Sequence, residues 1–375
     1  MIRKLKGLLP SGFSHNPFMM GYDSKIYDGD DTLGFVFPKK KLITPTEFVS
    51  VEDIIENIEA RDRIVINMGD SSTSGWNSNR IYRGNKNPNA PFFTYKTYSQ
   101  LMEEQTDLKV VNGGVPGYSS LQGKKYLEQL LRRFASEGID VDFTTFYFGN
   151  NDATYNKEED KVRLNRKKST PESDGYRVSV EDYRRNLRDM VETTRDYDVR
   201  PILIMPVVHY DWEPGIRSGY HKSEFGEALD ELADKKVRKE LERALREFKA
   251  GNYGNALELD MVLPRIKLRY QHILREIARE MNVPLIDIQA EIPRTDNSEY
   301  FADYCHPLEP TNQMITDKFF EVTGIEKGQR RTKDAFKLPL KYRIIEGVVD
   351  FLGCFVKHKS RKGGNEPPTR IYTTY

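Results

Sequence analysis

A serine with the surroundings of a nucleophile follows a predicted strand. Ser71 lies in the segment Gly-Asp-Ser-Ser-Thr-Ser-Gly, residues 69–75, directly after the apolar run 63–68. A serine hydroxyl at its ordinary pKa is a weak nucleophile, so catalysis requires a general base and donors that stabilise an oxyanion. If Ser71 is a nucleophile, the rest of the chain must supply both.

A candidate base lies far downstream, in the segment Asp-Tyr-Cys-His-Pro at residues 303–307. An acid three residues before a histidine can orient the imidazole and fix its tautomer within one short turn. His306 is therefore the predicted base, and Asp303 the acid that orients it. Cys305 beside His306 raises the alternative of a thiol nucleophile, but the serine turn is better formed, and a small buried residue is the favoured role for Cys305.

Two polar turns between the serine and the histidine offer oxyanion donors. Residues 112–118 read Asn-Gly-Gly-Val-Pro-Gly-Tyr and residues 149–152 read Gly-Asn-Asn-Asp, and each segment follows an apolar run typical of a strand. A glycine N–H can approach an oxyanion closely because no side chain intervenes, and an asparagine amide is a second, uncharged donor. Gly114 and Asn151 are predicted for these roles.

In this order the four segments resemble the GDSL, or SGNH, hydrolase superfamily, whose blocks read GDSxxxG, an NxG turn, GxND and DxxHP. The resemblance covers about residues 62–324 and departs mildly at Ser72, where the family usually has an aliphatic residue. It implies that Ser71 is the nucleophile and that the oxyanion hole consists of the backbone N–H groups of Ser71 and Gly114 and the side-chain amide of Asn151. It also implies a three-layer α/β/α sandwich of the flavodoxin-like kind.

The implied activity is hydrolysis of a small acyl or acetyl ester, on a small-molecule or carbohydrate substrate. No metal or organic cofactor is expected, because the sequence shows no Cys/His cluster and no phosphate-binding loop of the P-loop type. The same residues could pass the acyl group to a sugar hydroxyl, which would make the protein an O-acyltransferase in carbohydrate modification. A third hypothesis is a catalytically inactive binding module on the same fold.

Several further residues flank the catalytic turns or begin the segment after the fourth predicted strand. His209 alone could also be a base or a metal ligand, but no second ligand lies at suitable spacing, and an ordinary hydrogen-bonded histidine is favoured. Asn150 is expected to support its neighbour Asn151. The residues predicted to line the substrate pocket are Asp70, Trp76, Asn150, His209, Tyr210 and Trp212.

The composition is that of a soluble globular protein. Of 375 residues, 38% are hydrophobic and 31% are charged, and the formal net charge of +1 gives no reason to expect nucleic acid as a partner. The two cysteines are too few for a disulfide framework. No signal peptide is evident, and the apolar stretch 344–356 is too short to span a bilayer. We therefore expect a cytoplasmic protein, and the sequence leaves its oligomeric state open.

Strand-like runs alternate with segments of helical periodicity, which predicts an α/β fold with about five mainly parallel strands and helices on both faces. Helices are expected around 126–134 and 180–191, the second one capped by Ser179 and Asp182. The predicted strands lie near residues 63–68, 108–112, 143–148, 201–207 and 284–288.

The chain is predicted to contain one hydrolase domain, residues 61–325, between an N-terminal extension (1–60) and a C-terminal extension (326–375). Within the domain, residues from about 209 to 263 are expected to form a helical insertion that caps the site. The charged segment Thr154–Gly175 is expected to be a flexible loop beside the active-site edge.

Overall fold

The structure is a computed structural model, which describes part of the chain. Of the predicted features, Trp76 and the apolar stretch 344–356 lie outside this part, as do most of both extensions and most of Thr154–Gly175. The described residues are 28–30, 32–36, 55, 58, 63–75, 96–155, 160–161, 175–215, 235–295, 297 and 299–328.

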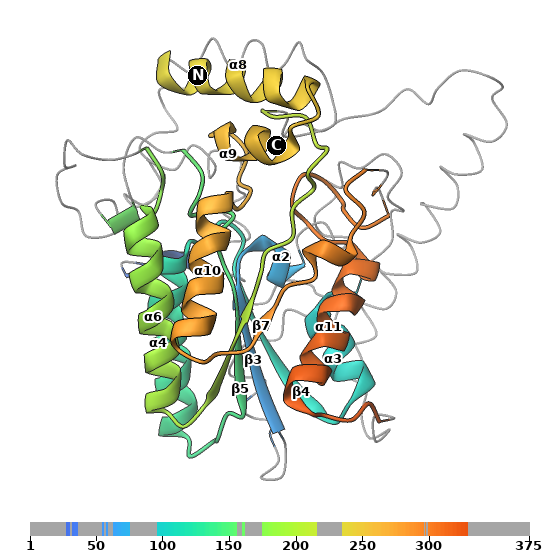
Figure 1. The fold of residues 1–375 in the computed structure, drawn as a ribbon. Helices are drawn as coiled ribbons and strands as arrows, with labels where there is room; N and C mark the ends of the chain where they lie inside the picture. The colour runs from blue at the N-terminus through green and yellow to red at the C-terminus, as the bar shows by residue number, and fades with distance from the viewer. Residues whose placement is uncertain are drawn as a thin grey trace, which may run out of the picture.

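A central sheet of five parallel strands organises the protein (Figure 1). Its strands, in chain order, are β3 (Arg63–Gly69), β4 (Leu108–Gly114), β5 (Phe143–Tyr147), β6 (Arg200–Ile204) and β7 (Leu285–Ile286). The spatial order is β4-β3-β5-β6-β7, so the chain first moves outward from β3 and then reverses direction. This is the flavodoxin-like order, and ligands bind such sheets where the strand order reverses, here between β3 and β5.

Alternation along β3 divides the core into two halves. Ile64, Ile66 and Met68 face one side of the sheet, whereas Val65 faces the other. Helices cover both faces, so the three-layer α/β/α prediction is confirmed (Figure 1). The first face carries α4 (Ser120–Ser136), α6 (Val180–Asp196) and α10 (Leu268–Glu280), and the second carries α3 (Tyr98–Gln105) and α11 (Glu309–Thr323).

The two predicted helices form with the expected buried faces. Helix α4 buries Leu127, Leu130 and Phe134, which recur at helical spacing. The side chain of Ser179 accepts a hydrogen bond from the Asp182 N–H and caps α6, as predicted. Helices α3, α10 and α11 complete the two outer layers and were not predicted from the sequence.

The insertion after β6 contains the predicted helical hairpin. Helix α8 (Lys235–Lys249) turns at Gly251, which has a φ of 79°, into α9 (Tyr253–Leu259). The hairpin packs apolar residues of α8 against Met261 and Tyr176. It therefore lies over the end of the molecule that carries the loops after the strands (Figure 1).

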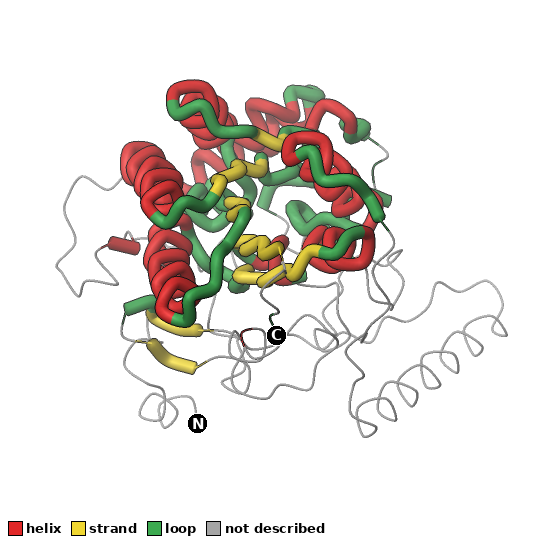
Figure 2. Tube along the Cα trace, turned by 90° about the horizontal axis from the view of Figure 1, so that it is seen from below, coloured by secondary structure: helices red, strands yellow, loops and turns green. Residues whose placement is uncertain are grey.

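A short antiparallel hairpin, β1 (Asp28–Asp30) and β2 (Gly34–Val36), lies outside the main sheet (Figure 2). Between its strands, Leu33 is fully buried and its carbonyl accepts a hydrogen bond of 2.7 Å from Gln122 Nε2. Among the described residues, no helix combines the length and the apolar character that crossing a bilayer would require.

Candidate active site

Ser71 begins a one-turn helix, α2 (Ser71–Ser74), immediately after β3. Asp70 caps this helix, because its Oδ1 accepts a hydrogen bond of 2.8 Å from the Ser72 N–H. The turn requires glycine at position 69, where an added Cβ would lie 1.9 Å from Thr73 Oγ1. The first N–H groups of a helix have no partner within it, so the Ser71 N–H is not used by the helix.

The residues predicted as base and acid meet Ser71 in one hydrogen-bonded chain. His306 Nε2 lies 2.8 Å from Ser71 Oγ, and His306 Nδ1 lies 2.7 Å from Asp303 Oδ2. A carboxylate can only accept, so the proton of the neutral ring is on Nδ1 and the lone pair on Nε2 faces the serine hydroxyl. This is the tautomer that a general base for Ser71 requires.

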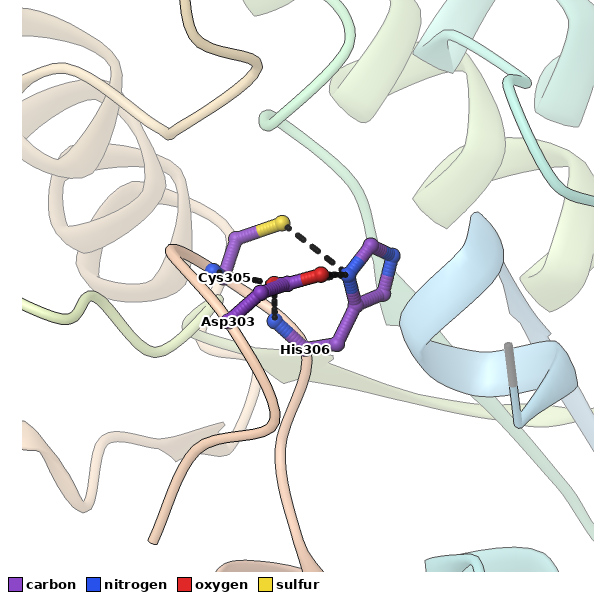
Figure 3. Close-up of side chains that lie close together, drawn as sticks. All are labelled: Asp303, Cys305 and His306. Carbon is purple, nitrogen blue, oxygen red and sulfur yellow. Dashed lines mark hydrogen bonds and ion pairs between the residues drawn. The ribbon is translucent and has the colours of Figure 1, made fainter. Parts of the chain in front are cut away.

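The Asp303 carboxylate is buried but well supplied with donors. Its Oδ1 accepts the backbone N–H groups of Cys305 and His306, both at 3.0 Å (Figure 3). Burial acts to raise the pKa of Asp303, but the charge of His306 and these hydrogen bonds outweigh it and hold the pKa below its usual value. A charged Asp303 can stabilise the imidazolium that forms when His306 takes a proton.

The thiol alternative for Cys305 is wrong. Its sulfur lies 3.8 Å from His306 Nδ1, on the side of the ring away from Ser71, and burial raises the pKa of the thiol well above its usual value (Figure 3). The ligand atoms of Asp303, Cys305 and His306 lie within 4.8 Å of one another, as they would in a metal site. Their closeness follows from the hydrogen bond between Asp303 and His306, which already engages the His306 Nδ1 nitrogen.

The structure corrects the prediction made for Gly114. Its N–H donates a hydrogen bond of 3.0 Å to Asn112 Oδ1, so this N–H is not free for an oxyanion. Glycine is needed there for packing, since an added Cβ would lie 2.3 Å from Ser74 N. Close approach of β4 to α2, and not a catalytic role, therefore explains Gly114.

A neighbouring glycine has the free N–H that Gly114 lacks. The Tyr118 N–H donates to Val115 O at 3.0 Å and closes a turn with Pro116 and Gly117 at its centre, with Gly117 at a φ of 83°. Within the described part of the chain, the Gly117 N–H has no hydrogen-bond partner. Its carbonyl is fixed by Arg177 Nη1 at 2.9 Å. The Pro-Gly pair is the signature of this turn, and it was the signal available in the sequence.

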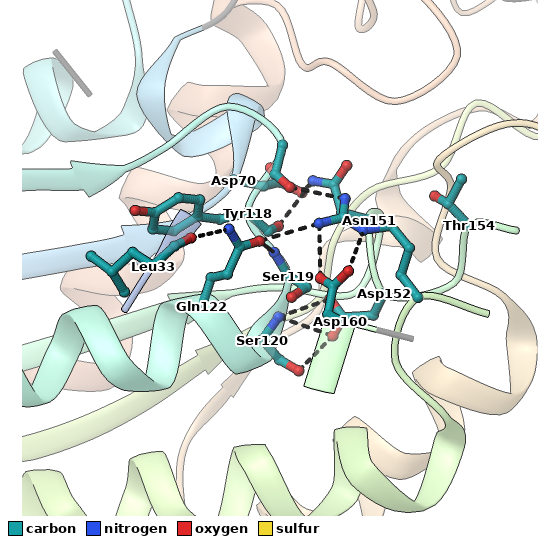
Figure 4. Close-up of polar contacts among 12 residues, drawn as sticks. Leu33, Asp70, Tyr118, Ser119, Ser120, Gln122, Asn151, Asp152, Thr154 and Asp160 are labelled. Atoms are coloured by element: carbon teal, nitrogen blue, oxygen red, sulfur yellow. Dashed lines mark hydrogen bonds and ion pairs between the residues drawn. The ribbon is translucent and has the colours of Figure 1, made fainter. Parts of the chain in front are cut away.

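Asn151 lies beside the same turn. One N–H of its Nδ2 donates to Tyr118 O at 3.0 Å (Figure 4). Nδ2 also lies 3.5 Å from Asp70 Oδ2, a distance at which a hydrogen bond is weak, so the second N–H can still be offered to an oxyanion. The loops after β3, β4 and β5 therefore meet at one point, as the predicted convergence of Ser71 and Asn151 requires. Because this point lies where the strand order reverses, it is the expected place for a ligand.

Two predicted pocket residues are supports beneath the site. Asp70 is fully buried, and its Oδ2 accepts from Asn150 Nδ2 at 3.3 Å. Burial raises the pKa of Asp70. Asn150 is also buried, and its Oδ1 accepts the Ile266 N–H at 3.0 Å. Both side chains are engaged in these internal contacts, which agrees with the supporting role expected of Asn150 and argues against either residue as a pocket wall.

His209 is buried against the loop that carries the acid. Its Nδ1 lies 3.0 Å from the Asp303 carbonyl oxygen, and its ring stacks on Phe301 with centroids 4.9 Å apart. It is thus a hydrogen-bonded histidine, and not a pocket wall or the base. Tyr210 is half-buried against the core of the first sheet face.

Trp212 is half-buried, and its ring lies 6.3 Å from that of Tyr304, edge to face. The Tyr304 ring in turn lies 6.1 Å from the His306 ring. Trp212 therefore remains a candidate wall of the pocket, together with Tyr304, which was not predicted. Tyr304 lies within the DxxHP block, in a position that the motif leaves unspecified, so the sequence pattern gave no signal for a pocket role of Tyr304.

The sheet order and the serine at its switch point define an α/β protein with the arrangement of a serine hydrolase. Residues 65–319 match the family model described as GDSL-like Lipase/Acylhydrolase, which spans more than half of the chain. The chain therefore belongs to this family, and the predicted resemblance is confirmed. The family places the protein among the ester hydrolases.

Solved structures of related proteins are similar at low sequence identity. A lipase/acylhydrolase from Enterococcus faecalis is 16% identical, with 72% of this chain and 100% of that chain covered and a TM-score of 0.39. A catalytic mutant of an acetylxylan esterase from Geobacillus stearothermophilus is 17% identical, with 74% and 99% covered and a TM-score of 0.39. A GDSL-like lipase from Bacteroides thetaiotaomicron is 11% identical, with 72% and 95% covered and a TM-score of 0.39. No curated protein matches the sequence.

Proposed function

We propose that the protein is a serine ester hydrolase that cleaves a small acyl or acetyl ester through Ser71, His306 and Asp303. The observation that carries this proposal is the unbroken chain of contacts from Ser71 Oγ to His306 Nε2 at 2.8 Å and from His306 Nδ1 to Asp303 at 2.7 Å. A serine activated in this way can form an acyl-enzyme, which divides one difficult step into two easier ones.

In the first step, Ser71 Oγ attacks the ester carbonyl carbon while its proton moves to His306 Nε2. The carbonyl oxygen becomes an oxyanion and accepts hydrogen bonds from the Ser71 and Gly117 N–H groups and from the Asn151 amide. His306 then returns the proton to the departing alkoxide, and the ester C–O bond breaks. Asp303 holds the imidazole in place and balances its charge in the interval.

In the second step, water attacks the acyl-enzyme and gives its proton to His306. The tetrahedral intermediate collapses, the bond between the acyl carbon and Ser71 Oγ breaks, and the proton returns to Ser71. This cycle uses side chains and backbone N–H groups alone. The products are a carboxylic acid and an alcohol.

The acyl group is proposed to be small because the turns that surround Ser71 are polar and no long apolar lid is recognisable in the sequence. A series of p-nitrophenyl esters from acetate to decanoate tests this directly. We expect kcat/KM to fall as the acyl chain lengthens. Equal or faster turnover of the decanoate would contradict the proposal of a small acyl pocket.

The nucleophile is tested by Ser71→Ala, with Ser72→Ala as a matched control in the same turn. After substitution, the backbone N–H of residue 72 can still donate its hydrogen bond to Asp70 Oδ1, and the side chain that loses its hydroxyl is buried. We expect Ser71→Ala to lower kcat about 10⁴-fold or more, and Ser72→Ala to change it by less than about tenfold. Full activity of Ser71→Ala would refute the proposed function.

A further inference from the structure

His209 presents both of its ring nitrogens to oxygen atoms. Nδ1 lies 3.0 Å from the carbonyl oxygen of Asp303, and Nε2 lies 2.9 Å from Asp211 Oδ1. A carbonyl oxygen only accepts hydrogen bonds, and an ionised carboxylate does the same. The contact with the Asp303 carbonyl oxygen requires an N–H on Nδ1, so His209 donates this hydrogen bond.

Asp211 lies beside the other ring nitrogen of His209. Burial acts to raise the pKa of Asp211, but its interaction with His209 outweighs burial and lowers it. Asp211 therefore remains an anion beside the ring. The pair resembles the Asp303 and His306 pair in composition, although its second nitrogen faces a backbone carbonyl in place of a serine.

The contact with Asp303 links this pair to the catalytic chain. Asp303 is held at two points: its carboxylate accepts N–H groups from its own loop, and its carbonyl oxygen meets His209, 94 residues earlier in the sequence. Anchoring the carbonyl fixes the peptide plane after Asp303, and that plane leads directly to the N–H groups that orient the carboxylate. A rotation there would move the carboxylate away from His306.

His209 is itself held rigidly. Its ring stacks on Phe301, with an interplanar angle of 13°, and Phe301 belongs to the same loop as Asp303. Its carbonyl accepts a hydrogen bond of 3.0 Å from Arg265 Nη1, and Arg265 is paired with Asp260 at 2.8 Å. Both members of that ion pair are almost fully buried. The charged groups around the ring are thus Asp211, Asp303 and the balanced pair of Arg265 and Asp260.

We propose that His209 is a positioning residue that locks Asp303, and through it His306, in the geometry needed to activate Ser71. This inference rests on the proposed ester hydrolysis. His209 acts through Asp303, so its loss lowers the rate of the chemical step and leaves substrate binding nearly unchanged. Displacing a reacting group by about 1 Å costs about 10²-fold in rate.

The first measurement is the steady-state kinetics of His209→Ala and His209→Asn with p-nitrophenyl acetate. We expect His209→Ala to lower kcat about 10- to 100-fold with KM changed less than about threefold. An asparagine amide at this position can still donate to the Asp303 carbonyl, so His209→Asn should recover part of this loss. His272→Ala, at an exposed histidine of α10, is the matched control and should leave kcat unchanged.

A double-substitution cycle separates positioning from a general loss of structure. If His209 acts only through Asp303, adding His209→Ala to Asp303→Asn should lower kcat by less than about twofold further. Independent, multiplying losses would overturn the inference, and so would an unchanged kcat in His209→Ala. If His209→Ala does not fold, the same cycle is run with His209→Asn.

A readout that does not need turnover separates this inference from the proposed function. The proton on His306 Nδ1, shared with Asp303, is expected to give a low-field resonance in the proton NMR spectrum of the wild-type protein. We expect His209→Ala to shift or broaden it and His272→Ala to leave it in place. An inactive wild type whose resonance depends on His209 would refute ester hydrolysis alone, whereas an active wild type whose resonance and kcat ignore His209 would refute the positioning role alone.

Discussion

Two buried carboxylates lie on opposite sides of the site, and their pKa values are shifted in opposite directions. Asp303, on the side of the base, has a pKa below its usual value, whereas burial raises the pKa of Asp152, beneath the oxyanion loop, to about 7. Asp303 faces His306, which becomes positive during the reaction. Asp152 accepts the Ser120 N–H at 2.9 Å and the Ser120 hydroxyl at 2.5 Å, which are neutral donors (Figure 4).

The contrast shows how burial and partners decide charge together. Burial disfavours the charged form of both acids, and a partner that gains positive charge is what reverses the balance at Asp303. At Asp152 the charge of Arg177 is offset by that of Asp160, with which Arg177 is paired at 2.9 Å. The base side is thus arranged around charge, and the oxyanion side is a scaffold of largely neutral hydrogen bonds.

The largest expected effect that sharpens this comparison is on the two adjacent asparagines of the oxyanion side. Removing one oxyanion donor costs about 10²–10³-fold in kcat, so we expect Asn151→Ala to lower kcat by that factor and to change Tm little. Asn150→Ala should lower Tm and change kcat little, because the Asn150 side chain donates to Asp70 and accepts the Ile266 N–H inside the protein. Steady-state kinetics and thermal unfolding of both variants check this.

If both variants lost kcat equally without loss of Tm, Asn150 would belong to the reacting groups and the division between donor and support would be wrong. Equal losses of Tm with kcat unchanged would remove Asn151 from the oxyanion hole.

A smaller effect is expected at Gly114, where glycine serves packing. An added Cβ would lie 2.3 Å from Ser74 N and 2.7 Å from the Thr73 carbonyl carbon, and backbone atoms cannot give way as flexible side chains do. We expect Gly114→Ala to lower the free energy of unfolding by about 2–3 kcal/mol, as overpacking does. Urea unfolding measures it, with Gly328→Ala as the control for added side-chain volume at a position with open space and no left-handed backbone. A stable Gly114→Ala would show that β4 and α2 are less closely packed than described.

A further expected effect is a pH dependence that belongs to the oxyanion side. Because the pKa of Asp152 in the folded protein is about 7, above the usual value of 3.8, its contribution to stability is fully present below 3.8 and is lost as pH rises through about 7. The amide that Asp152→Asn introduces does not titrate. We therefore expect wild type to lose on the order of 4 kcal/mol relative to Asp152→Asn between about pH 4 and pH 8, from about three pKa units at about 1.4 kcal/mol each.

Chemical denaturation at several pH values measures that difference. A constant difference between the two proteins would show that Asp152 is ionised throughout this range. Asp303 gives the opposite sign, because a lowered pKa keeps its contribution until the pH falls below the usual carboxyl range.

The base side could be predicted from the sequence because its chemistry resides in side chains. Ser71, Asp303 and His306 are recognisable by residue type. The order of their sequence blocks along the chain was enough to predict that the three side chains meet, as they do in the structure. The strands were predictable for a similar reason, since a buried parallel strand is a continuous apolar run. All five begin at the predicted residue or within one residue of it.

The oxyanion side was harder to predict because its donors are partly backbone groups, which every residue type but proline carries. The choice between Gly114 and Gly117 depends on where Asn112 Oδ1 points, and no spacing rule reveals that. The role of His209 was hidden likewise, because the Asp303 carbonyl that it meets is 94 residues away. Helix α11 was missed because its pattern is only weakly amphipathic, with polar Thr311, Asn312 and Thr316 buried.

The most direct test of the activated serine is labelling of the purified protein with a fluorophosphonate, followed by peptide mapping, with His306→Ala in parallel. We expect one adduct, on Ser71, that forms in the wild type and not in His306→Ala, because His306 Nε2 must take the Ser71 proton. An adduct on another serine would overturn the assignment of the nucleophile. A folded wild-type protein with no adduct would contradict the account as a whole.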